Sequence, residues 1–242
     1  MENTYTSEEL FHFVGHTTPN DDENNYKNLG LILKSRCISH YPHDGSWGTA
    51  SYLANFDNSL ETEELIVPSI TCYADIPSNS LSIHVNKYGK FGLGLPRNLL
   101  IQFGARPVTY IPMRSDDWRS NHGLTLLRDI EATVKGFNQH IVKKNTVQQS
   151  KPRSLGKIPD TTQETITCLE SMIYKDFLAF IKPFNSELAD DDPNNFYMER
   201  EWRKYGNMKF EPVNLTKIFV AKGYKERVET DYPEYKNTVI EI

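Results

Sequence analysis

The chain has 242 residues, of which 38% are hydrophobic and 12% aromatic, a globular composition with enough length to bury a sizeable core. The formal net charge of −5 argues against a protein held to nucleic acid by bulk electrostatics. No run approaches the roughly 18 apolar residues of a membrane span, and the acidic N-terminus lacks the basic start and apolar centre of a signal peptide. We therefore expect a soluble, cytoplasmic protein without membrane contact.

The cysteines and histidines indicate neither a disulfide frame nor a metal site. Cys37, Cys72 and Cys168 are far apart, odd in number and flanked by apolar residues, which predicts reduced, partly buried thiols. His40 and His43 are the closest histidine pair, but they resemble solvated loop histidines rather than zinc ligands. We expect no metal cofactor.

Short apolar runs broken by Gly, Pro, Asn and Asp fill residues 10–112. They predict strands at 10–14, 65–73, 91–95 and 107–111. They also predict short helices at 26–35 and 48–56, and one or two helical turns between Pro96 and Gly104.

Residues 116–184 change to helical periodicity. Apolar residues recurring at three and four predict one amphipathic helix over 124–141 and a second over 166–180. Thr161 followed by Glu164 offers the second helix a capping box. The polar, basic stretch 143–160 between them is long enough to be a mobile loop. Both apolar stripes indicate core packing.

Sequence patterns typical of β-strands return at 196–205 and 215–220, after an acidic, Asn-rich connector at 186–195. Strands before and after a helical pair predict an α+β fold. We expect one domain over 1–242, with a mixed, mostly antiparallel sheet and a two-helix insertion at about 116–184.

A charged segment stands out in the predicted strand 196–205. If it is extended, its period of two places four polar side chains on one face: Tyr197, Glu199, Glu201 and Arg203. Carboxylates repel each other on a shared face, so such a strand is unfavourable as a purely structural element of a sheet. Two interpretations stay open, a solvated edge strand with Glu and Arg paired, and a catalytic or ligand-binding face.

Other polar residues interrupt apolar runs. His12 alternates with Phe11 and Phe13, while His84 and Tyr88 are four apart and would share a helical face. Each alone is more often structural than catalytic. Combined with the charged strand, they would supply imidazole, phenol and carboxylate to one pocket. Such a pocket suits the binding of a ribose and the stabilisation of an oxocarbenium-like transition state.

Six segments of the chain form a recognisable set: LFHFVG at 10–15, LGLILK at 29–34, CYADIP at 72–77, HVNKYGKFG at 84–92, PVTYI at 107–111 and EREWR at 199–203. These segments resemble the bacterial abortive-infection family AbiGi. The resemblance spans most of the chain and is most specific at 72–92. Its members are described as antitoxins of two-gene phage-defence systems, which implies a cognate partner toxin encoded by a neighbouring gene.

A more distant resemblance concerns chemistry. A His in an early strand, followed by a helix of the Asn-Leu-x-x-Ile-Leu-Lys type, is similar to the DNA-modifying ADP-ribosyltransferases called DarT. That resemblance implies an ADP-ribosyltransferase-like fold with NAD as substrate. It assigns the ribose to His12, the nicotinamide to Tyr88 and catalysis to Glu201, with Glu199 as helper.

The same resemblance implies an Arg near the NAD phosphates. No Arg of this sequence matches that position clearly, and Arg97 or Arg36 could serve there. His84 and Arg203 would complete the cofactor-binding set. The Glu-x-Glu spacing resembles that of members which modify protein side chains. The acceptor would accordingly be a nucleic acid or a protein.

Two functions therefore stay open. The first is an antiphage enzyme that transfers ADP-ribose from NAD to a macromolecular acceptor. The second is a catalytically inactive AbiGi-type antitoxin that binds and neutralises a partner toxin. A third, a nucleic-acid-binding regulator using the basic 143–157 segment, is disfavoured by the overall acidity.

Overall fold

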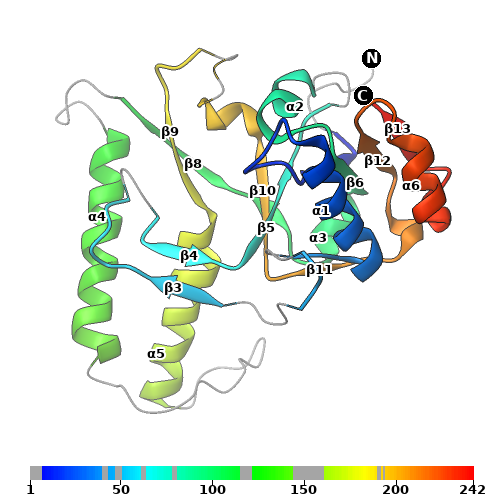
Figure 1. Cartoon of the computed structure of the whole chain (residues 1–242). Helices are drawn as coiled ribbons and strands as arrows, with labels where there is room; N and C mark the ends of the chain where they lie inside the picture. Colours follow the sequence, from blue (N-terminus) through cyan, green and yellow to red (C-terminus); the bar gives the residue numbers. More distant parts are fainter. Residues whose placement is uncertain are drawn as a thin grey trace. The chain divides into compact units, whose positions relative to one another are not determined.

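The computed structural model describes residues 7–39, 43–46, 51–60, 64–77, 81–114, 122–143, 161–189, 192 and 194–242. Its chain divides into two units (Figure 1). The first, here the sheet unit, comprises Met1–Ser51, Ser69–Val108 and Leu188–Ile242, and the second, the helical unit, comprises Tyr52–Pro68 and Thr109–Glu187. The predicted insertion falls in the helical unit, which also takes in residues 52–68. The single-domain organisation stays a prediction.

A seven-stranded sheet organises the sheet unit, in the order β13-β12-β6-β1-β5-β10-β7. Neighbouring strands are antiparallel except β12 and β13, which are parallel. This confirms the predicted α+β class with a mostly antiparallel sheet. The strands are β1 (Glu9–Phe13), β5 (Ile70–Ala74), β6 (Gly92–Pro96), β7 (Arg106–Pro107), β10 (Glu201–Tyr205), β12 (Lys217–Val220) and β13 (Val239–Glu241). A separate antiparallel pair joins β2 (Cys37–Ile38) to β11 (Met208–Lys209).

One face of the sheet, here the α1 face, carries the larger core. Residues opposite each other on antiparallel strands share a face, so Tyr73 and Trp202 lie together on this face. Leu10 and Leu93 join them in a cluster that also holds Leu29 of α1 (Asp22–Ser35). The helices α3 (Arg97–Gln102) and α6 (Lys225–Asp231) add one buried residue each to the same cluster, Leu100 and Val228.

The opposite face, here the α2 face, carries a smaller core. Phe11 of β1 pairs with Ala74 of β5, and both belong to a cluster with Phe219 of β12. Val85 of helix α2 (Ser82–Tyr88) packs against that cluster. The two helices α1 and α2 therefore cover different faces of one sheet.

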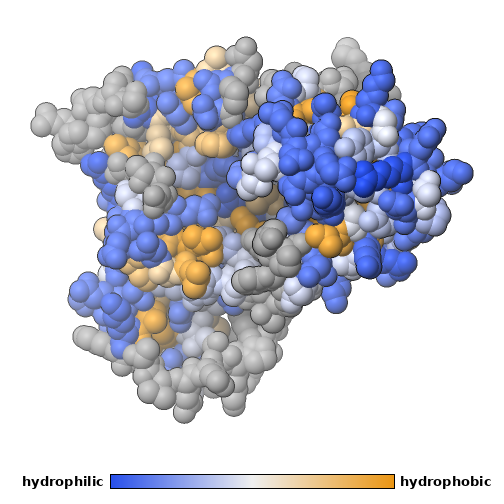
Figure 2. Space-filling view, viewed as in Figure 1, coloured by the Kyte–Doolittle hydropathy of each residue, from blue (hydrophilic) through white to orange (hydrophobic). Residues whose placement is uncertain are grey.

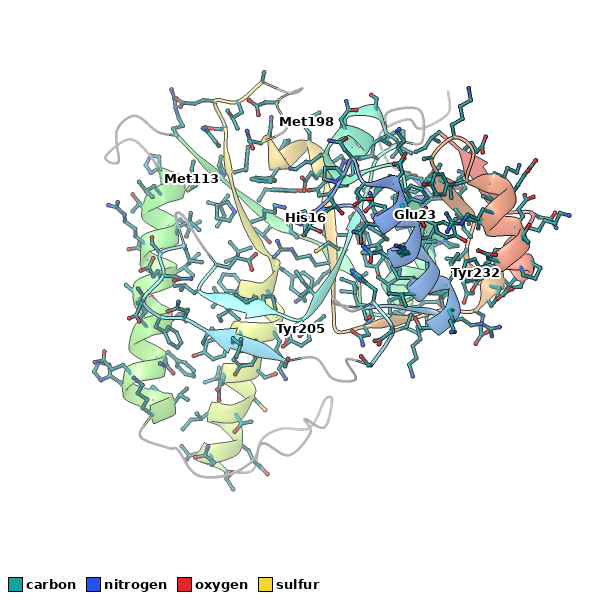
Figure 3. All side chains as sticks on the ribbon, viewed as in Figure 1. His16, Glu23, Met113, Met198, Tyr205 and Tyr232 are labelled. Atoms are coloured by element: carbon teal, nitrogen blue, oxygen red, sulfur yellow. The ribbon has the colours of Figure 1, made fainter. Side chains whose placement is uncertain are left out.

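Local signals explain helix α1. The Asp21 side chain accepts a hydrogen bond from the Asn24 backbone N–H, which is a standard N-cap, and Arg36 ends the helix in a left-handed conformation with φ 50°. The helix begins four residues before the predicted start at residue 26. A Cβ on Gly30 would lie 2.4 Å from the hydroxyl of Tyr232, at the end of α6, so glycine lets these two helices approach closely (Figure 3).

The helical unit holds the two predicted amphipathic helices. α4 (His122–Phe137) continues as a π-helix over Asn138–Val142, and α5 (Thr162–Ser171) continues as a π-helix over Met172–Phe177 and a 3-10 turn over Leu178–Phe180. The Thr161 side chain accepts from the Glu164 N–H at 3.1 Å, which confirms Thr161 as the N-cap, one half of the predicted capping box. The core of this unit takes Leu127 and Val134 from α4 and Tyr174 and Leu178 from the turns that continue α5. It packs them with the antiparallel pair β3 (Tyr52–Ala54) and β4 (Ile66–Pro68) and with the parallel pair β8 (Thr109–Met113) and β9 (Ile181–Asn185). α5 itself buries no residue, so the core packing predicted for its stripe does not hold there.

Several predicted elements were wrong in detail. Residues 52–54 of the predicted helix 48–56 form strand β3, because pairing with β4 prevails over local propensity; residues 47–50 lie outside the described chain. The predicted strands 65–73 and 107–111 are each split in two. Cys72 is exposed, since alternation along β5 turns Tyr73 to the α1 face and Cys72 away from it. Residues 144–160 of the predicted basic loop lie outside the described residues.

No helix within the described ranges combines the length and the apolar character that crossing a bilayer requires.

Candidate functional site

The charged segment 197–203 is not one extended strand, which corrects the prediction of a single face. Residues Phe196–Glu199 form a 3-10 helix, η6, whose first turn is capped by the side chain of Asn195. Arg200 then adopts a left-handed conformation with φ 46°, and β10 begins only at Glu201. Tyr197 consequently does not share the face of β10 that carries Glu201 and Arg203, and it is 51% exposed. Met198, labelled in Figure 3, marks the position of η6.

Glu199 is the centre of a buried polar cluster between η6 and the end of α2. The residue is 7% exposed, and its Oε1 accepts hydrogen bonds from Lys87 Nζ at 2.6 Å and from the Tyr88 hydroxyl at 2.5 Å. Lys87 Nζ also lies 4.0 Å from the centroid of the Phe196 ring, a cation–π contact. This arrangement, here the Glu199 cluster, ties α2 to the segment that leads into β10.

The Tyr88 hydroxyl stays protonated and acts as a hydrogen-bond donor. Burial raises the pKa of its phenol, and the charge and hydrogen bond of Glu199 raise it further, so the hydroxyl stays protonated. The Tyr88 ring lies 4.9 Å from the ring of His84 and 5.7 Å from that of His16. The first distance confirms that His84 and Tyr88 share a helical face, as predicted.

Glu201 and Arg203 form a second buried pair, at the start of β10. Glu201 Oε1 accepts from Arg203 Nε at 2.7 Å, and each residue is 4% exposed. Their strand partners are Ala74 and Cys72, which places both side chains on the α2 face. A buried ion pair tolerates loss of one partner poorly, because the remaining charge is left without compensation. The Glu201–Arg203 pair therefore contributes to the stability of the folded sheet.

A third carboxylate, Asp75, follows the end of β5. Its Oδ2 accepts from Arg200 Nη2 at 3.3 Å and its Oδ1 from the Ser7 N–H at 3.0 Å, while its own N–H donates to the Arg200 carbonyl. Sequence reasoning missed Asp75, Arg200 and Lys87. The signals were present, since Asp75 closes an apolar run and Lys87 precedes the predicted Tyr88.

His12 lies on the other side of the sheet from these groups. Its neighbour Phe11 belongs to the α2 face, so alternation turns His12 toward the α1 face, where its ring lies 5.9 Å from that of Tyr73. His12 Nδ1 lies 2.9 Å from the Cys72 carbonyl oxygen, which can only accept, so Nδ1 carries the proton. Its Nε2 is buried and has no hydrogen-bond partner in the part of the chain that the structure describes.

Burial lowers the pKa of His12 to about 4, and the hydrogen bond to Cys72 opposes this only in part. The imidazole is therefore neutral at physiological pH. The half-buried ring lies on the α1 face of the sheet, away from the carboxylates that it was expected to assist.

The predicted phosphate ligands are also separated from the Glu199 cluster. Arg97 donates its backbone N–H to Glu8, at the start of β1, whereas the Tyr88 carbonyl accepts from Gly15, just beyond the end of that strand. Strand β1 has five residues, so at about 3.3 Å per residue these two places lie at least about 13 Å apart. Arg36, the alternative, forms a surface ion pair with Glu211.

Of the predicted site residues, the structure thus gathers Glu199, Tyr88 and His84 around one cluster and pairs Glu201 with Arg203. It brings neither His12 nor Arg97 to them. Within the described ranges, no three His, Cys, Asp or Glu side chains are grouped as a metal site. Among the residues assigned to NAD, Tyr88 interacts with both Glu199 and Glu201, since burial raises the pKa of its phenol and the charges of the two carboxylates raise it further, whereas His12 faces the other side of the sheet and Arg97 lies apart.

Comparison with known proteins gives one family. Residues 49–241 match a family model described as "Putative abortive phage resistance protein AbiGi, antitoxin". No curated protein and no solved structure matches the chain. The likeness to DarT-type enzymes and the ADP-ribosyltransferase-like assignment of the fold stay predictions.

Proposed function

Because the chain belongs to the AbiGi family of abortive-infection phage defence, we propose that it is an antitoxin that binds and neutralises a cognate partner toxin. The family match covers 49–241, which includes the whole helical unit and all of β5 to β13. Neutralisation by binding requires a contact surface and a stable scaffold, and it requires no reactive group.

The pairing of the buried carboxylates favours a binding function over a catalytic one. The carboxylates Glu199, Glu201 and Asp75 are each buried and each bonded to a cation of the same chain. A carboxylate that stabilises an oxocarbenium ion must face its substrate. Here the nearest positive charges are protein side chains at 2.6 to 3.3 Å. This supports a structural role for the three carboxylates.

Transfer of ADP-ribose from NAD to a nucleic-acid or protein acceptor stays the competing prediction. It would require Glu201 to leave Arg203 and the imidazole of His12 to act from the opposite face of the sheet. The two functions differ in a simple assay, since the enzyme consumes NAD and the antitoxin does not.

The test expresses the neighbouring gene alone, this chain alone, and both together, with growth as the readout. We expect the neighbouring gene alone to arrest growth, this chain alone to be harmless, and co-expression to restore growth with the two proteins co-purifying. NAD levels should be unchanged by this chain. Growth arrest by this chain alone, together with NAD loss, would establish the enzyme instead.

A further inference from the structure

The seven-stranded sheet is joined at its centre by a single pair of residues. Strands β1 and β6 share five residue pairs, and β5 and β10 also share five, whereas β1 and β5 share only Phe11 with Ala74. All other neighbours in the sheet share two or more. The β1–β5 boundary, here the seam, therefore divides the sheet into two half-sheets, β13-β12-β6-β1 and β5-β10-β7. Because backbone hydrogen bonds join neighbouring strands, the seam is the most weakly joined line of the sheet.

The two strands diverge beyond that single pair. Antiparallel register would place Phe13 opposite Cys72 next, but no such pair forms between these two described residues. The end of β1 stays with its own half-sheet, where Val14 donates its N–H to the carbonyl of the residue before β6. The start of β5 stays with the other half-sheet, where Ile70 pairs with Tyr205. Accordingly, Cys72 is exposed and Phe13 is half-buried, although both lie on central strands.

The His12 side chain spans the seam where the backbone pairing stops. Asp75 donates its N–H to the carbonyl of Arg200 beside β10, so alternation turns the peptide groups of Ala74 and Cys72 toward β1. His12 Nδ1 donates to the Cys72 carbonyl oxygen at 2.9 Å. The imidazole thus takes the place that a backbone N–H of β1 would hold in a regular ladder, and it ties the two half-sheets together.

Side-chain packing supports the seam unequally on its two faces. On the α1 face, one core takes Leu10 from β1 and Tyr73 from β5, so it crosses the seam. Helices α1 and α6 contribute to this core, and Figure 2 shows a largely hydrophilic surface over them. On the α2 face, the smaller core lies at the end of the seam where Phe11 pairs with Ala74. The seam is therefore least covered on the α2 face, at Cys72.

We propose that the seam is a hinge within the sheet unit and that His12 keeps this hinge closed. Loss of the His12 hydrogen bond leaves one backbone pair between the half-sheets, so the seam opens locally while each half-sheet keeps its own ladder. The hinge is a property of this chain alone, and its test does not depend on a partner toxin.

Amide hydrogen exchange followed by NMR tests the hinge in the full-length chain, because adjacent residues report on different strand pairs. The Ala74 N–H faces β1 across the seam, whereas the N–H of the preceding residue, Tyr73, faces β10. In wild type, we expect Ala74 to exchange roughly 10-fold faster than Tyr73 after correction for intrinsic rates. His12→Leu removes the donor and should speed exchange at Ala74 by a further factor of roughly 10, as loss of one hydrogen bond implies, with Tyr73 unchanged.

The matched control is His12→Asn, because the side-chain amide nitrogen of asparagine occupies nearly the position of Nδ1 and also donates. Exchange at Ala74 in this variant should stay close to wild type. Faster exchange at Ala74 and Tyr73 alike in His12→Leu would mean that the whole sheet is destabilised, and it would overturn the proposal, as would unchanged exchange at Ala74. Equal protection of Ala74 and Tyr73 in wild type would also overturn it, and that comparison requires no variant to fold.

Discussion

His12 and Glu201 lie on opposite faces of the central sheet. Phe11 is opposite Ala74, and Ala74 is opposite Glu201, so these three share the α2 face. His12 follows Phe11 and faces the other way. A common catalytic site would need the two side chains on one face, and the strands that carry them are separated only by β5. The register of three strands thus excludes His12 from any pocket built around Glu201.

The first prediction concerns pH. His12 has a pKa of about 4 in the folded protein and an ordinary value of 6.5 when unfolded. Between pH 6.5 and 4 the His12 imidazole is protonated in the unfolded chain but stays neutral in the folded protein. The free energy of unfolding therefore falls as the pH drops from 6.5 to 4. The loss at this group amounts to about 3 kcal/mol. Urea unfolding across this range should show it, and His12→Gln should reduce the pH dependence.

The matched control is the exposed His140 on the helical unit. His140→Gln should leave the pH dependence of stability as it is in wild type. Equal slopes in His12→Gln and wild type would contradict a His12 imidazole that stays neutral in the folded protein.

The second prediction concerns the Glu199 cluster. Glu199→Gln leaves the largely buried Lys87 without its counter-charge and should lower the free energy of unfolding by about 3 kcal/mol. Adding Lys87→Met removes the stranded charge, so the double variant should be more stable than Glu199→Gln alone. A double-mutant cycle by chemical denaturation measures the coupling. Strictly additive effects would mean that the two side chains do not interact.

The third prediction concerns Gly15, whose N–H donates to the Tyr88 carbonyl. A Cβ there would lie 2.4 Å from that oxygen, so Gly15→Ala should push β1 and α2 apart and cost about 1–3 kcal/mol. Gly136→Ala is the control, since its Cβ would meet nothing within 4 Å and alanine favours the helix. Thermal unfolding of the two variants should therefore shift in opposite directions. Unfolding of Gly15→Ala at the wild-type temperature would show that this contact is not tight.

Some of this architecture follows from the sequence by local rules. The long amphipathic repeats of α4 and α5 and the cap at Thr161 concern residues a few positions apart, and periodicity identifies them. The apolar runs at β1, β6 and β12 are equally local.

The site could not be predicted in the same way. Arg200 breaks the charged segment with a left-handed conformation that is rare for arginine and has no sequence signal. Lys87 and Glu199 are 112 positions apart, so their pairing depends on tertiary structure. The relation between His12 and Glu201 depends on the strand order β1-β5-β10, which no local pattern encodes.

The most direct test of the account is toxin neutralisation by the paired variant Glu201→Gln/Arg203→Met. Both buried charges are removed together, so neither is left stranded and the fold should persist, as circular dichroism would verify. We predict that this variant, co-expressed with the neighbouring toxin gene, restores growth as wild type does. A folded variant that fails to restore growth and has lost an NAD-consuming activity present in wild type would contradict the account.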